Sequence, residues 1–302
     1  MFRYSIALLC LLTVALTGSG EGNRPDASED PVHLLFTTNL SGSLDDCRCG
    51  GPVVGGMNRL LHLIERQRER HPDLLLVDGG DFLNSYSLPD ANRIMLRLMA
   101  MARYDAVAVG DQEFVETPDF LREALFTEAP PAPLLAANLR HPAFPDFDGV
   151  RRTRAGATAV AIAALVGDDC FDFIDPGALE RGDPAAALRA IAAEMQAGSD
   201  LQVLLWHGGW TEARAVATAF PWLDVMILGH NHLRHVERIG TTTLAEAGSA
   251  AEYLGHLVLH DDGGAWRADT LFHPVTAGVP VDGDAEPLVR GYFDGLRSGG
   301  DR

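Results

Sequence analysis

The segment Leu74-Leu-Leu-Val-Asp-Gly-Gly-Asp81 decides the fold of this chain, because it runs from four apolar residues through two glycines to a carboxylate. A short apolar run bounded by turn residues is typical of a fully buried strand. Asp81 then follows the carboxyl end of that strand, which is the end where open α/β sheets bind their ligands.

Strands that alternate with helices are also expected on both sides of this segment. Residues 32–38 read as a strand, and a glycine-rich loop leads from it to an amphipathic helix over 56–70. A helix over 90–103 and a strand over 106–109 follow. Thr117-Pro118 and Asp183-Pro184 each place proline after an N-cap residue, which is typical of a helix start. Further strands are expected over 134–137, 158–166, 201–206 and 224–228.

Beyond Gly229 the helical pattern disappears until the last residues of the chain. Residues 241–245, 253–260 and 265–272 read as antiparallel strands. The earlier alternation of strands and helices predicts an α/β fold with a largely parallel sheet and helices outside it. The late strands are expected to add a second sheet.

Composition limits the classes of partner. The chain has 302 residues, 47% of them hydrophobic and 22% charged, which is ordinary for a globular protein and excludes global disorder. Its formal net charge of −18 repels polyanions. We therefore expect neither nucleic acid nor an anionic membrane surface as a partner.

The N-terminus has the layout of a secretory signal peptide. Arg3 precedes an apolar run over 6–16, and small residues follow it. The run is shorter than the ~20 residues of a spanning helix, although an uncleaved anchor is the alternative. We expect export to the periplasm or the extracellular space, with no stable membrane span after cleavage. The expected layout is a signal peptide (1–20), an acidic disordered segment (21–30), one domain (31–275) and a tail (276–302) with a short helix around 286–296.

Polar residues follow the carboxyl ends of several expected strands. Because strand ends meet at one edge of a sheet, residues that are distant in sequence can come together there. Imidazole and carboxylate ligands suit zinc, manganese and iron. The sequence therefore predicts a site for one or two divalent metal ions at this edge. Its candidate residues are Asn39, Asp81, Asp111, His207, His230 and His232.

The order of these motifs resembles that of the calcineurin-like metallophosphoesterases, and within them the catalytic domain of periplasmic 5′-nucleotidases. The motifs are Asn39-Leu-Ser41, Gly80-Asp81, Gly110-Asp-Gln-Glu-Phe114, Trp206-His207-Gly208 and Gly229-His230-Asn231-His232. The resemblance covers roughly residues 32–272 and implies a four-layer α/β/β/α sandwich. Full nucleotidases carry a second, substrate-binding domain, which we expect to be absent because about thirty residues remain.

The resemblance also implies a ligand set. One metal of the family is held by positions that match Asp81, Asp111, His207 and His230, where Asp111 replaces an asparagine and keeps an oxygen ligand. The other metal uses positions that match Asn39, Ser41, Asp81 and His232. Asn39 and Ser41 stand where the family has aspartate and histidine, so this half of the site is degenerate. Gln112 also replaces a histidine that helps to stabilise the leaving group.

Cys47 and Cys49 follow the first motif closely, in the segment Asp45-Asp-Cys-Arg-Cys49. One hypothesis is that they fold over the site and supply thiolate ligands in place of the lost ones. A local disulfide, two idle thiols and a redox-active pair are the alternatives.

Two functions follow from these expectations. The first is an exported, metal-dependent phosphoesterase that acts on a small phosphorylated substrate through a metal-activated water, with His232 and Asn39 orienting a phosphate oxygen. The second is a catalytically reduced protein of the same fold that binds a metal or another ligand, or takes part in thiol or redox chemistry.

Overall fold

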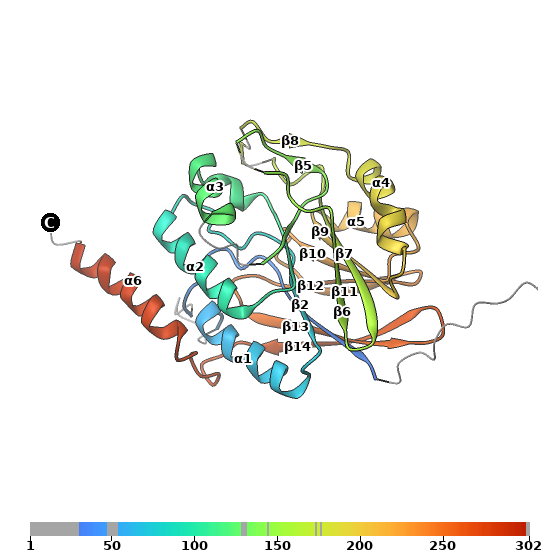
Figure 1. Ribbon diagram of the computed structural model, residues 1–302. Helices are drawn as coiled ribbons and strands as arrows, with labels where there is room; N and C mark the ends of the chain where they lie inside the picture. Colours follow the sequence, from blue (N-terminus) through green and yellow to red (C-terminus); the bar gives the residue numbers. More distant parts are fainter. Residues whose placement is uncertain are drawn as a thin grey trace, which may run out of the picture.

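The computed structural model describes residues 30–46, 54–127, 132–143, 145–172, 174–175 and 177–299. The expected signal peptide, nearly all of the acidic segment, and both Cys47 and Cys49 lie outside the described residues. Within the described ranges, two six-stranded sheets pack face to face and helices cover both outer faces (Figure 1).

The first sheet has the strand order β14-β13-β1-β2-β3-β4. Strands β1 to β4 are parallel to one another, whereas β13 and β14 extend the sheet antiparallel beside β1. The strands are β1 (Val32–Thr37), β2 (Leu75–Asp78), β3 (Ala106–Ala108), β4 (Leu134–Leu135), β13 (Tyr253–Asp261) and β14 (Trp266–Pro274). The helices on this side are α1 (Met57–Arg70), α2 (Pro89–Ala102), α3 (Pro118–Phe126) and α6 (Ala285–Gly299).

The second sheet has the strand order β11-β12-β10-β9-β7-β6. Its strands are β6 (Val150–Ala155), β7 (Thr158–Val166), β9 (Leu201–His207), β10 (Val225–Gly229), β11 (Arg234–Ile239) and β12 (Thr242–Ala247). The helices α4 (Pro184–Gln196) and α5 (Trp210–Ala219) cover it on the outside. The remaining short elements are a 3₁₀ turn, η1 (Gln112–Val115), and a small ladder of β5 (Leu139–Arg140) with β8 (Glu180–Arg181).

Buried apolar residues fill the three interfaces between the four layers of helices and sheets. Phe36, Val77 and Leu205 belong to the layer between the two sheets, where the sheets contact each other directly. A second layer joins the first sheet to its helices, and a third joins the second sheet to α4 and α5. Burial of the apolar faces of both sheets is the main stabilising contribution to such a fold. The predicted four-layer α/β/β/α sandwich is therefore confirmed.

The late strands are the part of the topology for which the sequence expectation was wrong. They do not form a sheet of their own, because β13 and β14 join the first sheet while β12 joins the second. Strand β12 even runs parallel to β10. The sequence pattern of a strand specifies which of its faces are apolar and does not specify its neighbour. Strands β6 and β11 and helix α5 were also not expected.

Both helices with the expected proline pattern begin as predicted. The side chain of Thr117 caps α3 and that of Asp183 caps α4, each accepting a hydrogen bond from a backbone N–H of the first turn. The tail forms α6 over Ala285–Gly299, which is longer than the short helix expected there.

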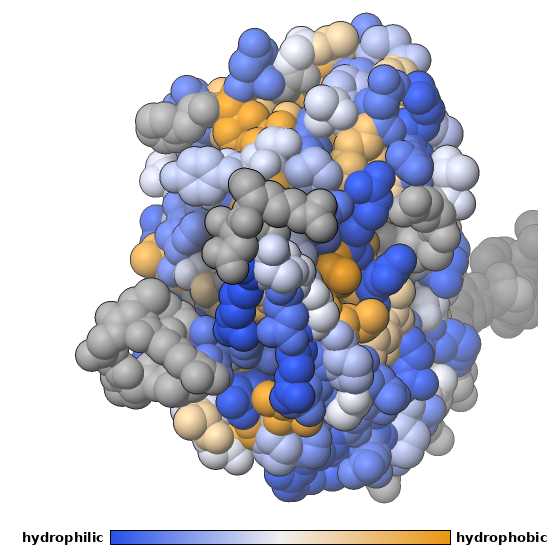
Figure 2. All heavy atoms as spheres, turned by 90° about the vertical axis from the view of Figure 1, so that its left-hand side faces the viewer, coloured by the Kyte–Doolittle hydropathy of each residue, from blue (hydrophilic) through white to orange (hydrophobic). Residues whose placement is uncertain are grey.

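The surface is mainly hydrophilic on the side of α2, α3 and α6. Figure 2 shows this face, where apolar residues form small separate patches among hydrophilic ones. Scattered single apolar residues are normal on a protein surface and do not by themselves indicate a partner. No helix in the part of the chain that the structure describes has both the length and the apolarity to cross a bilayer.

Candidate metal centre

The carboxyl ends of strands from both sheets meet at one edge of the sandwich. Asp81 follows β2 and Asp111 follows β3 in the first sheet, while His207 ends β9 and His230 follows β10 in the second. Asp81 and His230 have positive φ angles of 60° and 91°, a region that residues with a side chain rarely adopt. The loops therefore turn sharply at the strand ends, as is common at functional sites.

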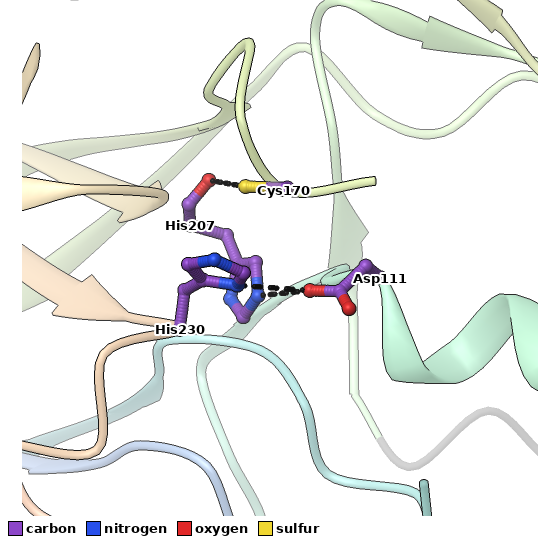
Figure 3. A group of neighbouring side chains, drawn as sticks. All are labelled: Asp111, Cys170, His207 and His230. Atoms are coloured by element: carbon purple, nitrogen blue, oxygen red, sulfur yellow. Dashed lines mark hydrogen bonds and ion pairs between the residues drawn. The ribbon is translucent and has the colours of Figure 1, made fainter. Parts of the chain in front are cut away.

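Asp111 is the centre of the resulting cluster. Its Oδ1 atom lies 3.1 Å from Nε2 of His207 and 3.1 Å from Nδ1 of His230, as Figure 3 shows. Oδ1 of Asp81 lies 3.2 Å from the same Nε2 atom of His207. Nε2 of His207 thus lies between the two carboxylates, and Asp111 joins it to the imidazole of His230.

The side chain of His207 is fully buried, and the backbone fixes the orientation of its ring. Its Nδ1 atom lies 2.8 Å from the carbonyl oxygen of Gly79. Because a carbonyl can only accept, Nδ1 carries the proton and Nε2 faces the two carboxylates. This is the arrangement that protein histidines use when they bind a metal, with the second nitrogen bonded to a carbonyl.

The imidazoles and carboxylates of this cluster shift one another's pKa values. Burial lowers the pKa of His207, but the charge of Asp81 and hydrogen bonds to both aspartates outweigh burial and raise that pKa well above its ordinary value. Burial raises the pKa of Asp111, and hydrogen bonds from His207 and His230 reverse this and hold it well below its usual range. Hydrogen bonding to Asp111 likewise raises the pKa of His230. The two imidazoles thus keep Asp111 ionised.

The donor set fits a divalent cation. Asp81 and Asp111 are 1% and 6% exposed, and the ion pairs that the structure gives them involve histidines alone, without lysine or arginine. Buried carboxylates are normally paired with a cation or bound to a metal. A cation bound by Nε2 of His207, Nδ1 of His230 and both carboxylates would satisfy all four groups at once.

Glu113 holds the two aspartate loops together. Its carboxylate accepts backbone hydrogen bonds from Asp81 at 3.2 Å, Leu83 at 3.0 Å and Gly110 at 2.7 Å. Burial and the nearby charge of Asp81 raise the pKa of Glu113 to about 8. These contacts show how Glu113 positions Asp81 and Asp111.

Both the nitrogen and the oxygen of the Asn39 side-chain amide form hydrogen bonds within the protein. Its Nδ2 group donates to Oε1 of Glu246 at 3.0 Å and to the carbonyl oxygen of Gly248 at 2.9 Å. Its Oδ1 atom accepts a hydrogen bond from the backbone N–H of His230 at 2.6 Å. The residue is also completely buried. Its contacts thus give no support to the expectation that it orients a phosphate oxygen.

Ser41 and His232 are the two remaining residues of the degenerate half-site. Ser41 donates its hydroxyl to the carbonyl oxygen of Asn39 at 3.2 Å. His232 is exposed, and its ring is not among the ligand atoms that converge on Asp111. Desolvation of this ring lowers the pKa of His232, with further effects from the charges of Asp81 and His230.

Cys170 is the member of the cluster that sequence reasoning missed. Ligand atoms of Asp111, Cys170, His207 and His230 all lie within 4.8 Å of one another (Figure 3). The thiol is completely buried, and this burial raises its pKa to about 12. The sequence did contain a signal for Cys170, because this residue follows the carboxyl end of β7 just as the other candidate ligands follow their strands.

Two glycines permit this close packing. A Cβ atom on Gly110 would lie 2.3 Å from Oδ1 of Asp81 and 2.6 Å from Cε1 of His207. A Cβ atom on Gly80 would lie 2.6 Å from Nδ1 of His207. The glycines beside the aspartates thus allow backbone and ligands to approach more closely than any other residue would.

Comparison with known proteins relates the chain to a set of hydrolases. No protein-family model matches it. Its curated relatives are 5′-nucleotidases and metallophosphoesterases. The snake venom 5′-nucleotidase of Naja atra is 27% identical over 205 residues, which cover 63% of this chain and 38% of the relative. The chain spans about two fifths of the length of the first curated relatives it matches.

Solved structures share the fold. The 5′-nucleotidase precursor from Thermus thermophilus has a TM-score of 0.75 and 21% identity, and the match covers 89% of this chain and 59% of that one. The sulfate thiohydrolase SoxB of Thermus thermophilus, in complex with glycerol, has a TM-score of 0.77 and 18% identity over 91% of this chain and 62% of that one. The resemblance drawn from the motifs is confirmed.

Proposed function

We propose that this relative of the 5′-nucleotidases and metallophosphoesterases is a metal-dependent phosphoesterase that hydrolyses a small phosphorylated substrate. The observation that supports it most is the convergence of two buried carboxylates and two imidazoles, with no lysine or arginine paired to them among the described residues. The ligands in this proposal are Asp81, Asp111, His207 and His230. A nucleotide is the substrate that the names of the relatives suggest.

The proposal assigns each group one task. A divalent cation bound here supplies Lewis-acid chemistry, which lowers the pKa of water and withdraws charge from a phosphoryl oxygen. Asp81 and Asp111 hold their negative charges in place, and His207 presents Nε2 because Gly79 fixes its tautomer. His232, exposed two residues after His230, contacts the substrate phosphate. Asn39 acts through His230, whose backbone it binds.

We further propose that the centre holds one cation rather than two. The amide of Asn39 is engaged by Glu246, Gly248 and His230, so its oxygen already serves as an acceptor inside the protein. The hydroxyl of Ser41 bonds to backbone. The cation is zinc, manganese or iron, all of which accept imidazole and carboxylate ligands.

Metal analysis and a phosphatase screen of the purified full chain test this proposal. The expected results are close to one equivalent of bound metal and hydrolysis of a 5′-nucleotide or a generic phosphomonoester with zinc, manganese, iron or cobalt. Asp81→Ala should reduce turnover at least about 100-fold. Asp119→Asn, which changes a carboxylate that is 84% exposed on α3, is the matched control and should retain full turnover. Retained turnover in Asp81→Ala would reject the site.

A catalytically reduced metal- or ligand-binding protein is the second candidate. It is favoured by the engaged amide of Asn39 and by Gln112, whose buried Oε1 atom has no hydrogen-bond partner in the structure. Metal-loaded protein that shows no turnover with any of the four metals would reject the hydrolase and favour this function.

Export to the periplasm or the extracellular space is also part of the proposal. It rests on the signal peptide expected over residues 1–20. Expression of the full chain, with N-terminal sequencing of the product recovered outside the cytoplasm, tests it. A product that keeps Met1 and stays in the cytoplasm would contradict export.

A further inference from the structure

The loop that follows β7 brings a sulfur atom to the candidate metal centre. Strand β7 runs parallel to β9 with Val166 opposite His207, so the next residues pass directly over that histidine. The backbone N–H of Gly167 donates to the carbonyl oxygen of His207 at 2.8 Å, and the thiol of Cys170 donates to the same oxygen at 2.8 Å. The sulfur thus lies on the second-sheet side of the cluster.

Hydrogen bonds before Cys170 and an aromatic contact after it fix the position of the loop. The backbone N–H of Asp168 donates to Glu212 at 3.1 Å, and Asp169 accepts from the backbone of Gly209 at 3.3 Å. Phe171 packs against Phe114 of η1, with ring centroids 5.7 Å apart. These contacts join the loop to α5 on one side and to the Asp111 loop on the other. The position of the sulfur therefore follows from packing that involves both halves of the centre.

A small movement would bring the sulfur of Cys170 to bonding distance from a cation bound by Asp111, His207 and His230. The distance from the sulfur to each ligand atom of Asp111, His207 and His230 is within 4.8 Å. Donor atoms of a tetrahedral zinc site with one sulfur are about 3.4–3.6 Å apart, so a shift on the order of 1 Å is enough. The carbonyl oxygen of His207 would keep its hydrogen bond from Gly167, so the movement leaves no buried acceptor unpaired there.

We propose that Cys170 is a thiolate ligand of the cation bound by Asp111, His207 and His230. This inference rests on the metal centre of the proposed function. On binding, the S–H bond breaks, a metal–sulfur bond forms and the proton leaves to the solvent buffer. A donor set with a thiolate, two imidazoles and carboxylate favours zinc or cobalt over manganese, because thiolate is a soft ligand. The thiolate also balances one further positive charge at the centre.

Cobalt(II) absorption of the full chain tests this assignment under reducing conditions. A thiolate ligand produces sulfur-to-cobalt charge transfer in the near ultraviolet, which oxygen and nitrogen ligands do not. The test compares the wild type, Cys170→Ser, Cys170→Ala and the triple variant C10S/C47S/C49S. The triple variant removes every other cysteine of the chain. Unfolding curves of each variant establish that it is folded.

The expected result is a charge-transfer band in the wild type and in the triple variant, which is absent in Cys170→Ser and Cys170→Ala. Cobalt affinity should fall by about 10- to 100-fold in the two Cys170 variants. The number of protons released per cobalt should fall by one.

Two results would overturn the assignment while leaving the metal centre intact. One is stoichiometric cobalt binding by the wild type with no charge-transfer band. The other is a band that disappears only in the triple variant, which would make Cys47 or Cys49 the sulfur ligand. Failure of the wild type to bind cobalt at all would overturn both this inference and the proposed function.

Discussion

Oδ1 of Asn39, just after the end of β1 in the first sheet, accepts a hydrogen bond from the backbone N–H of His230 in the second sheet at 2.6 Å. This bond links the two sheets at the edge where the metal ligands meet. It also holds His230 in its left-handed backbone conformation, with a φ of 91°. Asn39 is therefore a structural link between the two halves of the centre.

Replacement of Asn39 should reduce stability and metal affinity together. Asn39→Ala leaves the His230 N–H without its partner, which costs about 1–3 kcal/mol. It also removes one of the two hydrogen bonds that Glu246 Oε1 and the Gly248 carbonyl oxygen each accept. We expect the free energy of unfolding in urea to fall by about 2–4 kcal/mol. Cobalt affinity should fall as well, because His230 loses its support.

Asn138→Ala is the matched control for that experiment. The side chain of Asn138 is also buried and also makes three hydrogen bonds, to Val166 through both its N–H and its carbonyl oxygen and to Gly182. The variant should lose a similar amount of stability and keep its metal affinity. Equal loss of metal affinity in both variants would contradict a specific role for Asn39.

Gly110→Ala should weaken metal binding without removal of a ligand. The new Cβ atom would meet Oδ1 of Asp81 and the ring of His207, both buried, so both ligands must move. We expect at least about a tenfold loss of cobalt affinity by titration. Gly291→Ala on α6 is the control, since a Cβ atom there meets nothing within 4 Å. It should stabilise the helix by about 0.5–1 kcal/mol and leave affinity unchanged.

Asp111→Ala, which removes the ligand oxygen that an asparagine would keep, should weaken metal binding and remove the stabilisation that metal provides. A ligand present at 100 times its dissociation constant stabilises a folded protein by about 2.7 kcal/mol. We therefore expect zinc to raise the Tm of the wild type and to leave that of Asp111→Ala nearly unchanged. A chelator should reverse the shift in the wild type. An equal zinc-dependent shift in both proteins would place the metal elsewhere.

A group of histidines far from the centre predicts a loss of stability in acid. Nδ1 of His33 lies 2.9 Å from Nε2 of His256, and Nδ1 of His256 lies 3.3 Å from Nε2 of His273. His71 stacks on His33 with ring centroids 3.6 Å apart. Burial, followed by the charge of His33, lowers the pKa of His256 to about 3. Burial also lowers the pKa values of His33 and His273.

The sign of the pH effect follows from these directions. The unfolded chain binds protons below an ordinary histidine pKa of about 6.5, whereas the folded His256 resists protonation down to about 3. Stability should therefore fall as pH decreases through this window, by up to about 1.4 kcal/mol per pH unit for each such histidine. His256→Gln should reduce this slope in urea unfolding between pH 7 and 4, and His62→Gln on α1 should not. An unchanged slope in His256→Gln would contradict the prediction.

Much of the fold could be predicted from local patterns, whereas sheet membership could not. The apolar runs at 32–38 and 158–166 and the proline starts of α3 and α4 are encoded in consecutive residues, and the structure has elements at these places. The position of β13 beside β1 depends on residues far apart in the chain, such as Val32 and Leu259. Backbone pairing carries no residue code of its own, so the strand pattern alone does not identify its partner.

The candidate site divides in the same way. Asp81, Asp111, His207 and His230 could be recognised in the sequence because each follows a strand end, and the resemblance arranged them in one family pattern. Only the tertiary structure decided that Asn39 is engaged by Glu246 and His230, and that Cys170 joins the cluster. Strand ends are local features, but which of them face each other depends on how two sheets twist and pack. A hydrogen-bond partner or a converging sulfur is therefore decided by three-dimensional distance, which residue order does not record.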